Sequence, residues 1–491
     1  MSNPYAMALK KLVSLTETKN LVLAHLTGYD ISYISKWCSG RKVPTAKHID
    51  RINGQLAAYF AETLTAQGQT ASFYRLVPSA STAPSLGDAI AAYLQTAYSQ
   101  SCQPQQSSSD GEAGQTGHII TGNHDAAKFL ETLLTDRIPT IEGDGNLLIL
   151  GEFCTLYDLG FWKYLEAVPL QARHFTIRVG VDVDKLVSDT TYTHHLYMLL
   201  NRLLNYDFIF YDYRHVAHTN MIILEHEFAV QYALESPEAI GLCTYMDDPS
   251  VVTDLYQRFI LRFTSHEPIF APSRLLGIDA MGFRTAFYSA SNFFFFLTNG
   301  FDFLLPSSAI DEFLSSIQAS DQVVRQISHL RIMWEELLST VNVEFLLPTT
   351  SIIRYIETGY MFFTDAEFRM NSEGRKLHLQ NIIATMQKNH RIKMGVFQSS
   401  SQTTEYHEAN LSFYSNFSSA FMKKNPQFIT NDASPIYVVS NTKLVNAFHL
   451  FFYTLKELQT YHQYTYEEIY EKYKKYKSFI ERTIDLHETL S

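Results

Sequence analysis

The stretch from residue 99 to residue 117 divides this chain of 491 residues into two parts. It consists mostly of Ser, Gln and Gly and holds almost no apolar residue, so it cannot bury enough surface to fold by itself. A chain of this length also exceeds what one compact core usually holds. We therefore expect a flexible linker here, joining a small N-terminal part to a large C-terminal part.

The N-terminal part has a helical pattern, whereas the C-terminal part alternates strand and helix patterns. Apolar residues make up 46% of the chain and charged residues 18%, which is typical of a globular protein. Short β-branched and aromatic runs after the linker indicate buried strands, and the intervening segments have helical periodicity. The expected strands are 147–150, 175–181, 208–213, 221–224, 239–244, 343–347, 392–397, 411–414 and 436–440.

The C-terminal part also contains an internal repeat. Four pairs of segments share an apolar pattern in the same order along the chain: 176–180 with 391–395, 220–224 with 410–414, 239–244 with 435–440, and 251–259 with 444–452. These matches predict a duplicated α/β body. The alternative is that any two strand-and-helix units share this periodicity.

Charge is distributed unevenly between the two parts. The net charge is −11, yet residues 1–60 hold eight Lys or Arg against three acidic residues, a balance of +5 that leaves −16 for the rest. A basic head on an acidic body is typical of a DNA-binding protein whose other domains are kept away from phosphates.

Residues 20–44 have the pattern of two short helices joined by a tight turn. Leu23 and Ala24 mark the inner face of the first helix, Gly28 suits its left-handed end, and Asp30 suits the start of the next helix. The second helix is expected to turn three apolar residues inward, namely Ile31, Ile34 and Trp37.

The outward residues of this second helix are polar. They are Ser32, Tyr33, Ser35 and Lys36, and the following turn, Gly-Arg-Lys-x-Pro, adds Arg41 and Lys42. Short hydroxyl groups at the start of such a helix suit base edges in the major groove, and the cations suit the phosphate backbone.

With this pattern, residues 5–60 resemble the lambda-repressor-like (XRE) helix-turn-helix family. The chain departs from the family at Asn20, which usually is Gln, and at Cys38, which usually is acidic. The resemblance implies a homodimer that binds a palindromic double-stranded DNA operator through adjacent major grooves. The implied DNA-binding residues are Asn20, Ser32, Tyr33, Ser35, Lys36, Arg41 and Lys42.

The duplicated body weakly resembles phospholipase-D-like domains, which carry His-x-Lys-x(4)-Asp once in each half. The positions that align with this motif are His218, Asn220 and Glu225 in the first half and Glu408, Asn410 and Ser415 in the second. No His-x-Lys occurs among the 18 histidines, and Asn cannot neutralise a phosphate as Lys does. The resemblance therefore implies a degenerate body that is not an enzyme.

A cleft between the two halves is then the expected ligand site. Its candidate residues are His218, Asn220, Glu225, Glu408 and Asn410. The ligand is an unknown small molecule or peptide. The four cysteines have no paired spacing, and no phosphate-binding loop is present, so we expect neither a metal nor a cofactor. Without a signal pattern or a long apolar stretch, the protein is expected to be cytoplasmic and not membrane-bound.

The predicted fold class is α+β multidomain, with an all-α helix-turn-helix head, a duplicated α/β body, a helical linking segment and a C-terminal helix. The expected segments are a helix-turn-helix domain at 1–65, a helical extension at 66–98, the linker at 99–117, a first α/β unit at 118–271, a helical connection at 272–342, a second α/β unit at 343–460 and a C-terminal helix at 461–491.

The predicted function is that of a dimeric, ligand-sensing transcriptional regulator. Two alternatives are a DNA-tethered phosphodiesterase or nuclease of a mobile element or defence system, and a peptide-sensing regulator with a helical-repeat body. The 34-residue period that such a helical body needs is not visible in the sequence.

Overall fold

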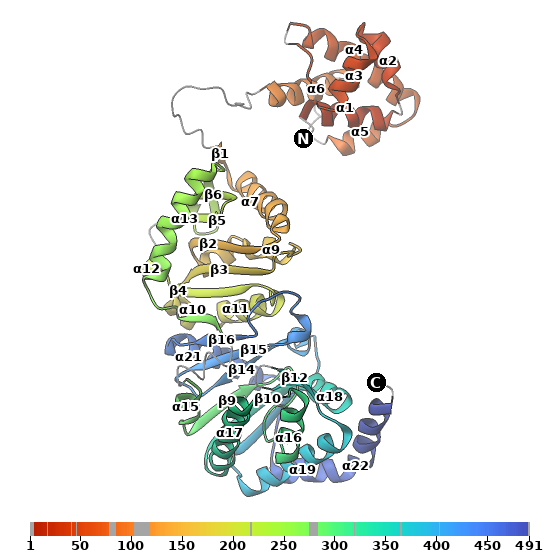
Figure 1. The fold of residues 1–491 in the computed structure, drawn as a ribbon. Coiled ribbons are helices and arrows are strands. Elements are labelled where there is room, and N and C mark those ends of the chain that lie inside the picture. Colours follow the sequence, from red (N-terminus) through yellow and green to blue (C-terminus); the bar gives the residue numbers. More distant parts are fainter. Residues whose placement is uncertain are drawn as a thin grey trace. The chain divides into compact units, whose positions relative to one another are not determined.

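The computed structural model describes residues 4–16, 18–40, 42–45, 47–77, 85–102, 118–216, 219–273, 283–318, 320–363, 366–401 and 403–489. The chain forms two compact units, a head at residues 1–115 and a body at residues 116–491 (Figure 1). Among the described residues, no helix combines the length and the apolar composition needed to cross a membrane.

The regular secondary structure of the head is entirely helical among its described residues. Its helices are α1 (Pro4–Leu15), α2 (Asn20–Thr27), α3 (Ile31–Cys38), α4 (Ile49–Ala66), α5 (Thr70–Leu76) and α6 (Leu86–Cys102). One apolar core joins all of them, with members such as Leu9, Ile52, Phe73 and Ile90. Helices α5 and α6, which were expected to form an extension, therefore contribute to the head's core.

Helix α6 continues four residues into the segment that was expected to be linker. The backbone N–H of Tyr5 donates a hydrogen bond to Ser101 Oγ at 2.8 Å, and the Tyr98 hydroxyl donates to the Pro44 carbonyl at 3.0 Å. These contacts hold the end of α6 against the start of the head, so the expected linker start at residue 99 is wrong. Residues 103–117 lie outside the described part of the chain.

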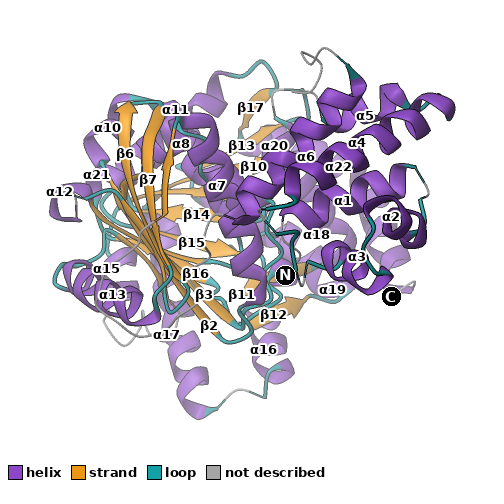
Figure 2. Ribbon diagram, turned by 90° about the horizontal axis from the view of Figure 1, so that it is seen from above, coloured by secondary structure: helices purple, strands orange, loops and turns teal. Residues whose placement is uncertain are grey.

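The body is built on one mixed sheet with helices on both faces (Figures 1 and 2). Its strands are β1 (His118–Thr121), β2 (Asp144–Glu152), β3 (His174–Val181), β4 (Asp207–Asp212), β5 (Met221–Leu224), β6 (Phe228–Ser236), β7 (Ala239–Met246), β8 (Phe270–Ser273), β9 (Asn292–Phe296), β10 (Asn342–Pro348), β13 (Ile392–Phe397), β14 (Leu411–Ser415), β15 (Ala420–Lys424), β16 (Ile436–Val439) and β17 (Tyr461–Tyr464). A separate hairpin is formed by β11 (Tyr360–Phe363) and β12 (Ala366–Arg369).

The helices of the body follow the strands in chain order. They are α7 (Asn123–Arg137), α8 (Phe153–Asp158), α9 (Trp162–Glu166), α10 (Val183–Ser188), α11 (Thr190–Arg202), α12 (Tyr213–Val216), α13 (Pro249–Thr264), α15 (Phe283–Tyr288), α16 (Ser307–Ser316), α17 (Asp321–Thr340), α18 (Thr349–Thr358), α19 (Ser372–Lys388), α20 (Thr404–His407), α21 (Thr442–Thr454) and α22 (Tyr466–Thr489). Short 3-10 turns occur at Ile138–Thr140, Pro426–Phe428 and Leu455–Glu457.

The strand order repeats, which confirms the predicted duplication. The sheet runs β1-β7-β6-β5-β2-β3-β4 and continues as β8-β16-β15-β14-β9-β10-β13, with β17 at the far edge. In each run the last three strands are parallel and the other pairings are antiparallel. Three of the four matched pairs occupy equivalent places in the two runs, namely β5 with β14, β7 with β16, and α13 with α21.

The fourth matched pair is wrong. Residues 176–180 lie in β3, whose counterpart in the second run is β10, whereas residues 391–395 lie mostly in β13. Parallel strands buried on both faces have similar apolar runs, so periodicity alone cannot tell one from its neighbour. The mostly helical connection expected at 272–342 also contains β9, a central strand whose Phe run carries no alternation.

The two halves are related by a reversal of strand direction. Between β2 and β9 the path through the sheet crosses five antiparallel pairings, so these equivalent strands run in opposite directions. The counterpart helices α13 and α21 also lie on opposite faces of the sheet. Leu148 and Leu150 of β2 pack beneath α13, whereas Phe294 and Phe296 of β9 share a core with α21. The carboxyl ends of the parallel strands therefore lie at opposite edges of the sheet.

A buried ion pair joins the two halves. The Lys424 ammonium lies 2.9 Å from Asp207 Oδ1 and also donates to the carbonyls of Leu204 and Tyr206. Both charged side chains are almost fully buried, at 0% and 1% exposure. Burial alone raises the pKa of Asp207, but the adjacent Lys424 cation, followed by hydrogen bonds, holds that pKa below its usual value.

Candidate nucleic-acid interface

The helix-turn-helix geometry of α2 and α3 depends on two residues between them. Gly28 ends α2 with a φ of 73°, in the left-handed region that favours glycine. Asp30 then begins α3, accepting a hydrogen bond from the backbone N–H of Ser32 at 2.8 Å. The Ser32 hydroxyl and N–H hold the pKa of Asp30 below its ordinary value, so the cap is ionised at neutral pH.

Helix α3 presents a polar face above a buried apolar one. Ile34 and Trp37 are 1% and 2% exposed, whereas Ser32, Tyr33 and Ser35 are exposed. This division places the predicted base-reading side chains outward on a helix whose inner face is held by the head's core. The three exposed residues lie on the first five residues of α3, the part that contacts base edges when such a helix enters a major groove.

Aromatic contacts support this face. The Tyr33 ring centroid lies 6.0 Å from that of Tyr29, which in turn lies 5.0 Å from that of Trp37. The Lys36 ammonium lies 5.5 Å from the Tyr33 ring centroid, within reach of a cation–π interaction. Tyr33 and Lys36 are therefore held together before any ligand is bound.

Ile31 departs from the expected inward orientation. It is 46% exposed, as the first residue of α3, and lies on the same end of the helix as Ser32. Periodicity at i, i+3 and i+6 placed it with Ile34 and Trp37, but only these two belong to the head's core, because no other helix of the described residues packs over Ile31 at the first turn of α3. An exposed aliphatic group at this end suits contact with a thymine methyl group.

The two departures from the family pattern contact each other. The Cys38 thiol lies 3.8 Å from Asn20 Oδ1, to which it donates a weak hydrogen bond. Burial raises the pKa of the Cys38 thiol, so it remains protonated and able to donate. Asn20 is half-buried at the start of α2 and its Oδ1 is engaged in this contact.

The turn after α3 carries the cation Lys42. Its backbone N–H donates to the Lys36 carbonyl at 3.2 Å, which ties the turn to the end of α3, and its side chain is exposed. Gly40 supports the turn with a φ of 77°. Arg41 lies outside the described residues. Lys36 and Lys42 thus border the polar face of α3.

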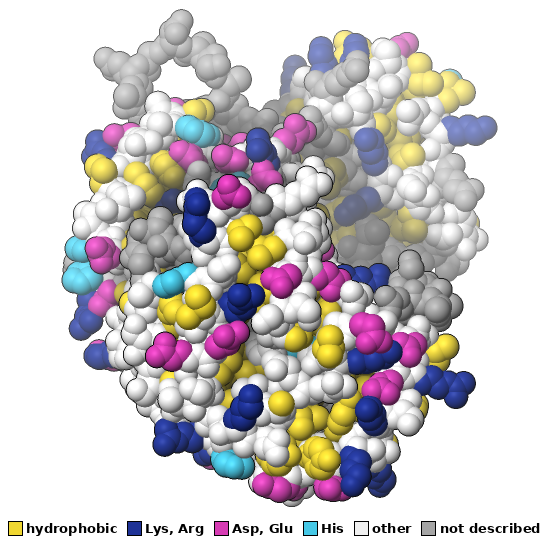
Figure 3. Space-filling model, turned by 60° about the horizontal axis from the view of Figure 1, so that its bottom comes forward, with side chains coloured by type: hydrophobic (Ala, Val, Ile, Leu, Met, Phe, Trp, Pro, Cys, Tyr) yellow, Lys and Arg dark blue, Asp and Glu magenta, His cyan; other side chains and the backbone are white. Residues whose placement is uncertain are grey.

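The surface of the body has a different charge pattern. On the face shown in Figure 3, Lys and Arg side chains are interspersed with Asp and Glu side chains. A mixed surface of this kind does not attract phosphates as a cationic stripe does.

The residues expected to form a ligand site in the body do not come together. Asn220 directly precedes β5 and Asn410 directly precedes β14, and each carbonyl accepts a hydrogen bond from the neighbouring strand, from Tyr232 and Asn425 respectively. The two positions are therefore equivalent in the repeat. They are seven strands apart in the sheet, about 33 Å along it.

Strand direction separates them further. An odd number of antiparallel pairings lies between β5 and β14, so these strands begin at opposite edges of the sheet. Glu225 follows β5 and binds Asn146 Nδ2 at 2.8 Å, while Glu408 lies beside Asn410 in the other half. His218 lies outside the described residues. The expected single cleft holding all five residues is therefore not formed within one subunit.

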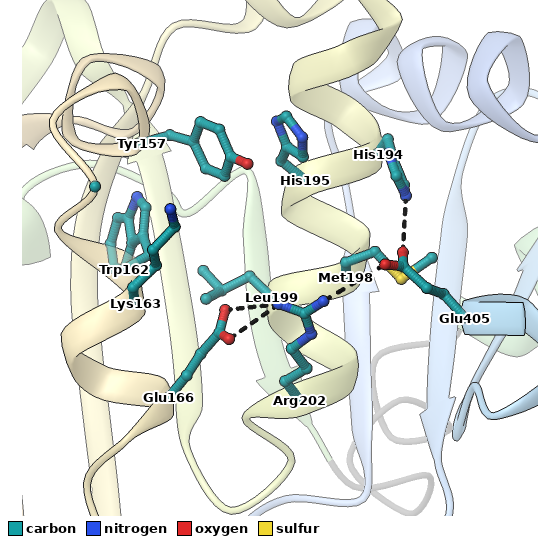
Figure 4. A pocket seen from close by; sticks show the side chains of 11 residues that line it. Tyr157, Trp162, Lys163, Glu166, His194, His195, Met198, Leu199, Arg202 and Glu405 are labelled. Atoms are coloured by element: carbon teal, nitrogen blue, oxygen red, sulfur yellow. Dashed lines mark hydrogen bonds and ion pairs between the residues drawn. The ribbon is translucent and has the colours of Figure 1, made fainter. Parts of the chain in front are cut away.

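A small pocket with several charged side chains among its lining residues lies beside α11 instead (Figure 4). It has a volume of about 180 Å³, and Arg202 bridges Glu166 at 2.9 Å and Glu405 at 3.7 Å across it. His194 lies 3.4 Å from Glu405, while His195 stacks on Tyr157 at 3.9 Å. Burial lowers the pKa of His195. The ionic groups of this pocket thus neutralise one another.

Within the described ranges, no cluster of three or more His, Cys, Asp or Glu side chains is placed to hold a metal ion. The adjacent pair His194 and His195 make the contacts given above rather than converging on one point.

Comparison with known proteins yields only distant likenesses. No protein-family model and no curated protein matches the chain. Among solved structures, TrmBL2, described as an archaeal chromatin protein with a novel mode of DNA binding, is 10% identical with a TM-score of 0.21, over 32% of this chain and 55% of that one. The chain thus spans about half the length of TrmBL2. A phosphatidylserine synthase from Haemophilus influenzae is 9% identical with a TM-score of 0.24, over 75% of this chain and 94% of that one.

Proposed function

We propose that this protein is a sequence-specific DNA-binding transcriptional regulator. The observation that carries the proposal is the face of α3, where Ser32, Tyr33 and Ser35 are exposed above the buried Ile34 and Trp37. The exposed side chains suit base edges, and Lys36 and Lys42 suit the flanking phosphates. The positive balance of residues 1–60 adds a favourable electrostatic contribution to binding.

The protein acts as a homodimer on a palindromic operator, because one α3 reads only a short half-site. The body supplies dimerisation and ligand sensing and takes no part in catalysis. Supporting this role, Asn220 and Asn410, the counterparts of a catalytic lysine, begin strands at opposite edges of the sheet. Cleavage of a phosphodiester substrate by the purified protein, lost on His218→Ala, would overturn the non-catalytic role.

Selection from a random double-stranded DNA library tests the proposal directly. We expect the full chain to enrich an inverted repeat whose half-sites are about 10 base pairs apart. Fluorescence anisotropy on the enriched site then compares variants. Ser35→Ala should relax base preference at one position, and Lys36→Ala should lower affinity about tenfold on all sequences and reduce the salt slope by about 0.9.

The matched control is Lys474→Ala, which removes the same charge from the exposed middle of α22 in the body. It should leave affinity and salt slope unchanged. Failure to enrich any sequence, or equal affinities for Lys36→Ala and the unchanged protein, would refute DNA recognition by α3.

A further inference from the structure

A largely apolar cavity lies at the carboxyl ends of β9, β10 and β13 in the second half of the body. Its volume is about 410 Å³, within the range of small-molecule sites. Leu347 and Val396 line it from the ends of β10 and β13, Ile352 and Ile383 line it from α18 and α19, and α22 forms its roof. In open α/β sheets, ligands bind outside the carboxyl ends of the parallel strands.

The corresponding strand end of the first half carries a buried carboxylate. Continuing the antiparallel registers of β2 with β5 and of β9 with β14 makes Gly300 the counterpart of Glu152. Glu152 is 6% exposed and accepts hydrogen bonds from the backbone N–H groups of Cys154 and Thr155, both at 2.9 Å. Gly300 has a φ of 84° and lines the cavity, and it lets the backbone of Tyr360 approach closely, because a Cβ at this position would lie 2.5 Å from the Tyr360 carbonyl oxygen. The two halves therefore differ at this position, with a buried carboxylate in the first and a glycine in the second.

The helices that cover these two places also differ. In the first half, α10 and α11 pack against α21, whose Phe448, Phe451 and Phe452 are at most 2% exposed. In the second half, the equivalent α18 and α19 pack against α22, which contributes Tyr473 and Tyr476. Buried phenylalanines of α21 thus pack against the helices of the first half, whereas tyrosines of α22 cover a cavity in the second half.

The roof helix is fixed at its two ends and covers the cavity with one face of its middle. Near its start Ile469 packs into the second half's core, and near its end Ile484 is fully buried and its carbonyl accepts a hydrogen bond from Arg375 at 3.4 Å. Between them, Tyr473 and Ile480 line the cavity, whereas Phe479 on the outer face is 71% exposed. One face of α22 therefore covers the cavity.

Three hydroxyl groups lining the cavity lack hydrogen-bond partners among the described residues. They are Ser351 Oγ, Thr460 Oγ1 and Tyr473 OH, each shielded from solvent, and Ser351 as a whole is only 3% exposed. An unsatisfied buried hydroxyl is unfavourable and is normally paired in a native structure. These groups can donate hydrogen bonds to a ligand's oxygen atoms.

The cation at the cavity favours an anionic ligand. Lys472 lines the cavity, and no carboxylate does among the described lining residues. His462 also lines it, but its Nε2 lies 3.1 Å from Glu468 Oε1. Lys472 lies above the Tyr464 ring at 4.7 Å and also borders an adjoining surface hollow with Lys474, Lys475 and Glu471. The net charge beside the opening is positive.

From these observations we propose that the cavity under α22 binds a small apolar molecule that carries one carboxylate, such as a medium-chain fatty acid. The apolar part lies against Ile352, Ile383 and Val396, and the carboxylate accepts hydrogen bonds from the unpaired hydroxyl groups and faces Lys472. The role of this ligand as an effector rests on the proposed regulatory function. Its binding does not, because binding is measured without DNA.

Isothermal titration calorimetry of the full chain with decanoate tests the proposal. We expect saturable binding at one site per chain with a micromolar Kd, and about tenfold weaker binding of 1-decanol, which has the same chain without the charge. Ile383→Trp, which fills the cavity, should weaken decanoate binding at least about tenfold. Lys472→Met should weaken decanoate about fivefold and leave 1-decanol unchanged.

Phe479→Ala is the matched control, since Phe479 lies on the same helix but is exposed and does not line the cavity. It should bind decanoate normally. Circular dichroism of Ile383→Trp checks that the variant is folded. Absence of saturable decanoate binding, normal binding by folded Ile383→Trp, or equal affinity for 1-decanol would overturn the proposal, whether or not the head binds DNA.

Discussion

Ile31 and Ile34 of α3 lie three residues apart but differ in burial, so we expect Ile31 to contact DNA and Ile34 to stabilise the head. Ile31 is 46% exposed at the first turn, whereas Ile34 is 1% exposed in the head's core. Sequence periodicity assigns both to the inner face, and only the contacts of the folded head distinguish them. The same apolar side chain therefore has different consequences at the two positions.

Ile31→Ser is expected to leave stability within about 0.5 kcal/mol, because no packed contact is lost at an exposed site. Ile34→Ala, the matched buried change, should cost about 2 to 5 kcal/mol. Thermal unfolding of the head measures both. Library selection with Ile31→Ser should yield an altered half-site, and an unchanged half-site would show that Ile31 does not touch the bases.

Two buried histidines make stability depend on pH. Burial lowers the pKa of both His378 and His449 to about 4. In the unfolded chain each has a pKa of about 6.5, so between these values the unfolded state binds more protons and is favoured as pH falls. The stability that the two neutral histidines contribute is fully present above pH 6.5. Going down to pH 4 lowers the free energy of unfolding by about 3 kcal/mol per histidine.

Chemical denaturation of the body at pH 7, 5 and 4 measures this effect. His449→Phe should reduce the loss between pH 7 and pH 4 by about 3 kcal/mol, whatever its effect on stability at pH 7. An identical pH dependence in this variant would show that His449 titrates normally in the folded state.

At the scale of elements, α6 completes the head. Asn53 of α4 links Tyr5 of α1 to Gln95 of α6, accepting from the Tyr5 hydroxyl at 2.9 Å and donating to Gln95 Oε1 at 2.7 Å. Ile90 and Leu94 of α6 are fully buried. A helix-turn-helix domain ending at residue 65 would expose these apolar contacts and break the hydrogen-bonded link.

A fragment of residues 1–102 is therefore expected to unfold cooperatively, and a fragment of residues 1–66 is not. Each buried side chain of the size of Ile90 or Leu94 contributes about 1.5 to 3 kcal/mol, against a total of about 5 to 15 kcal/mol for a small domain. Circular dichroism during heating compares the two fragments. A cooperative transition of the short fragment at the same Tm would contradict this account of α6.

At the scale of the whole molecule, the body's halves are joined by the Lys424–Asp207 pair as well as by the continuous sheet. Asp207 lies at the start of β4 and Lys424 at the end of β15, so the pair connects residues more than two hundred positions apart. Neither charge is exposed enough to be stabilised by water if its partner is removed.

Lys424→Met is expected to cost about 3 to 5 kcal/mol, because it leaves a buried carboxylate unpaired. Adding Asp207→Asn to this variant should recover part of the loss. The control is the exposed pair Lys443–Asp184, where Lys443→Met should cost much less, because water screens both charges. Denaturation curves of the body provide all three values, and equal costs at the two pairs would contradict the role of burial.

Local patterns in the sequence determined much of the molecule. Gly28, Asp30 and the spacing of Ile34 and Trp37 predict α2 and α3, and β-branched runs predict strands such as β5 and β13 at their observed bounds. These features depend on neighbours within a few residues, where backbone preference and periodicity act. The helix-turn-helix and the duplication of the body were therefore accessible without a structure.

Only the tertiary structure decided which residues from distant parts of the chain lie close together. Whether Ile31 is covered, whether α6 belongs to the head, and whether Asn220 and Asn410 share a cleft all depend on elements distant in the chain. The reversal of strand direction between the halves separates those two asparagines, and the packing of α18, α19 and α22 encloses the apolar cavity. Periodicity describes one face of one element, but a site requires the relative placement of several, which long-range packing alone sets.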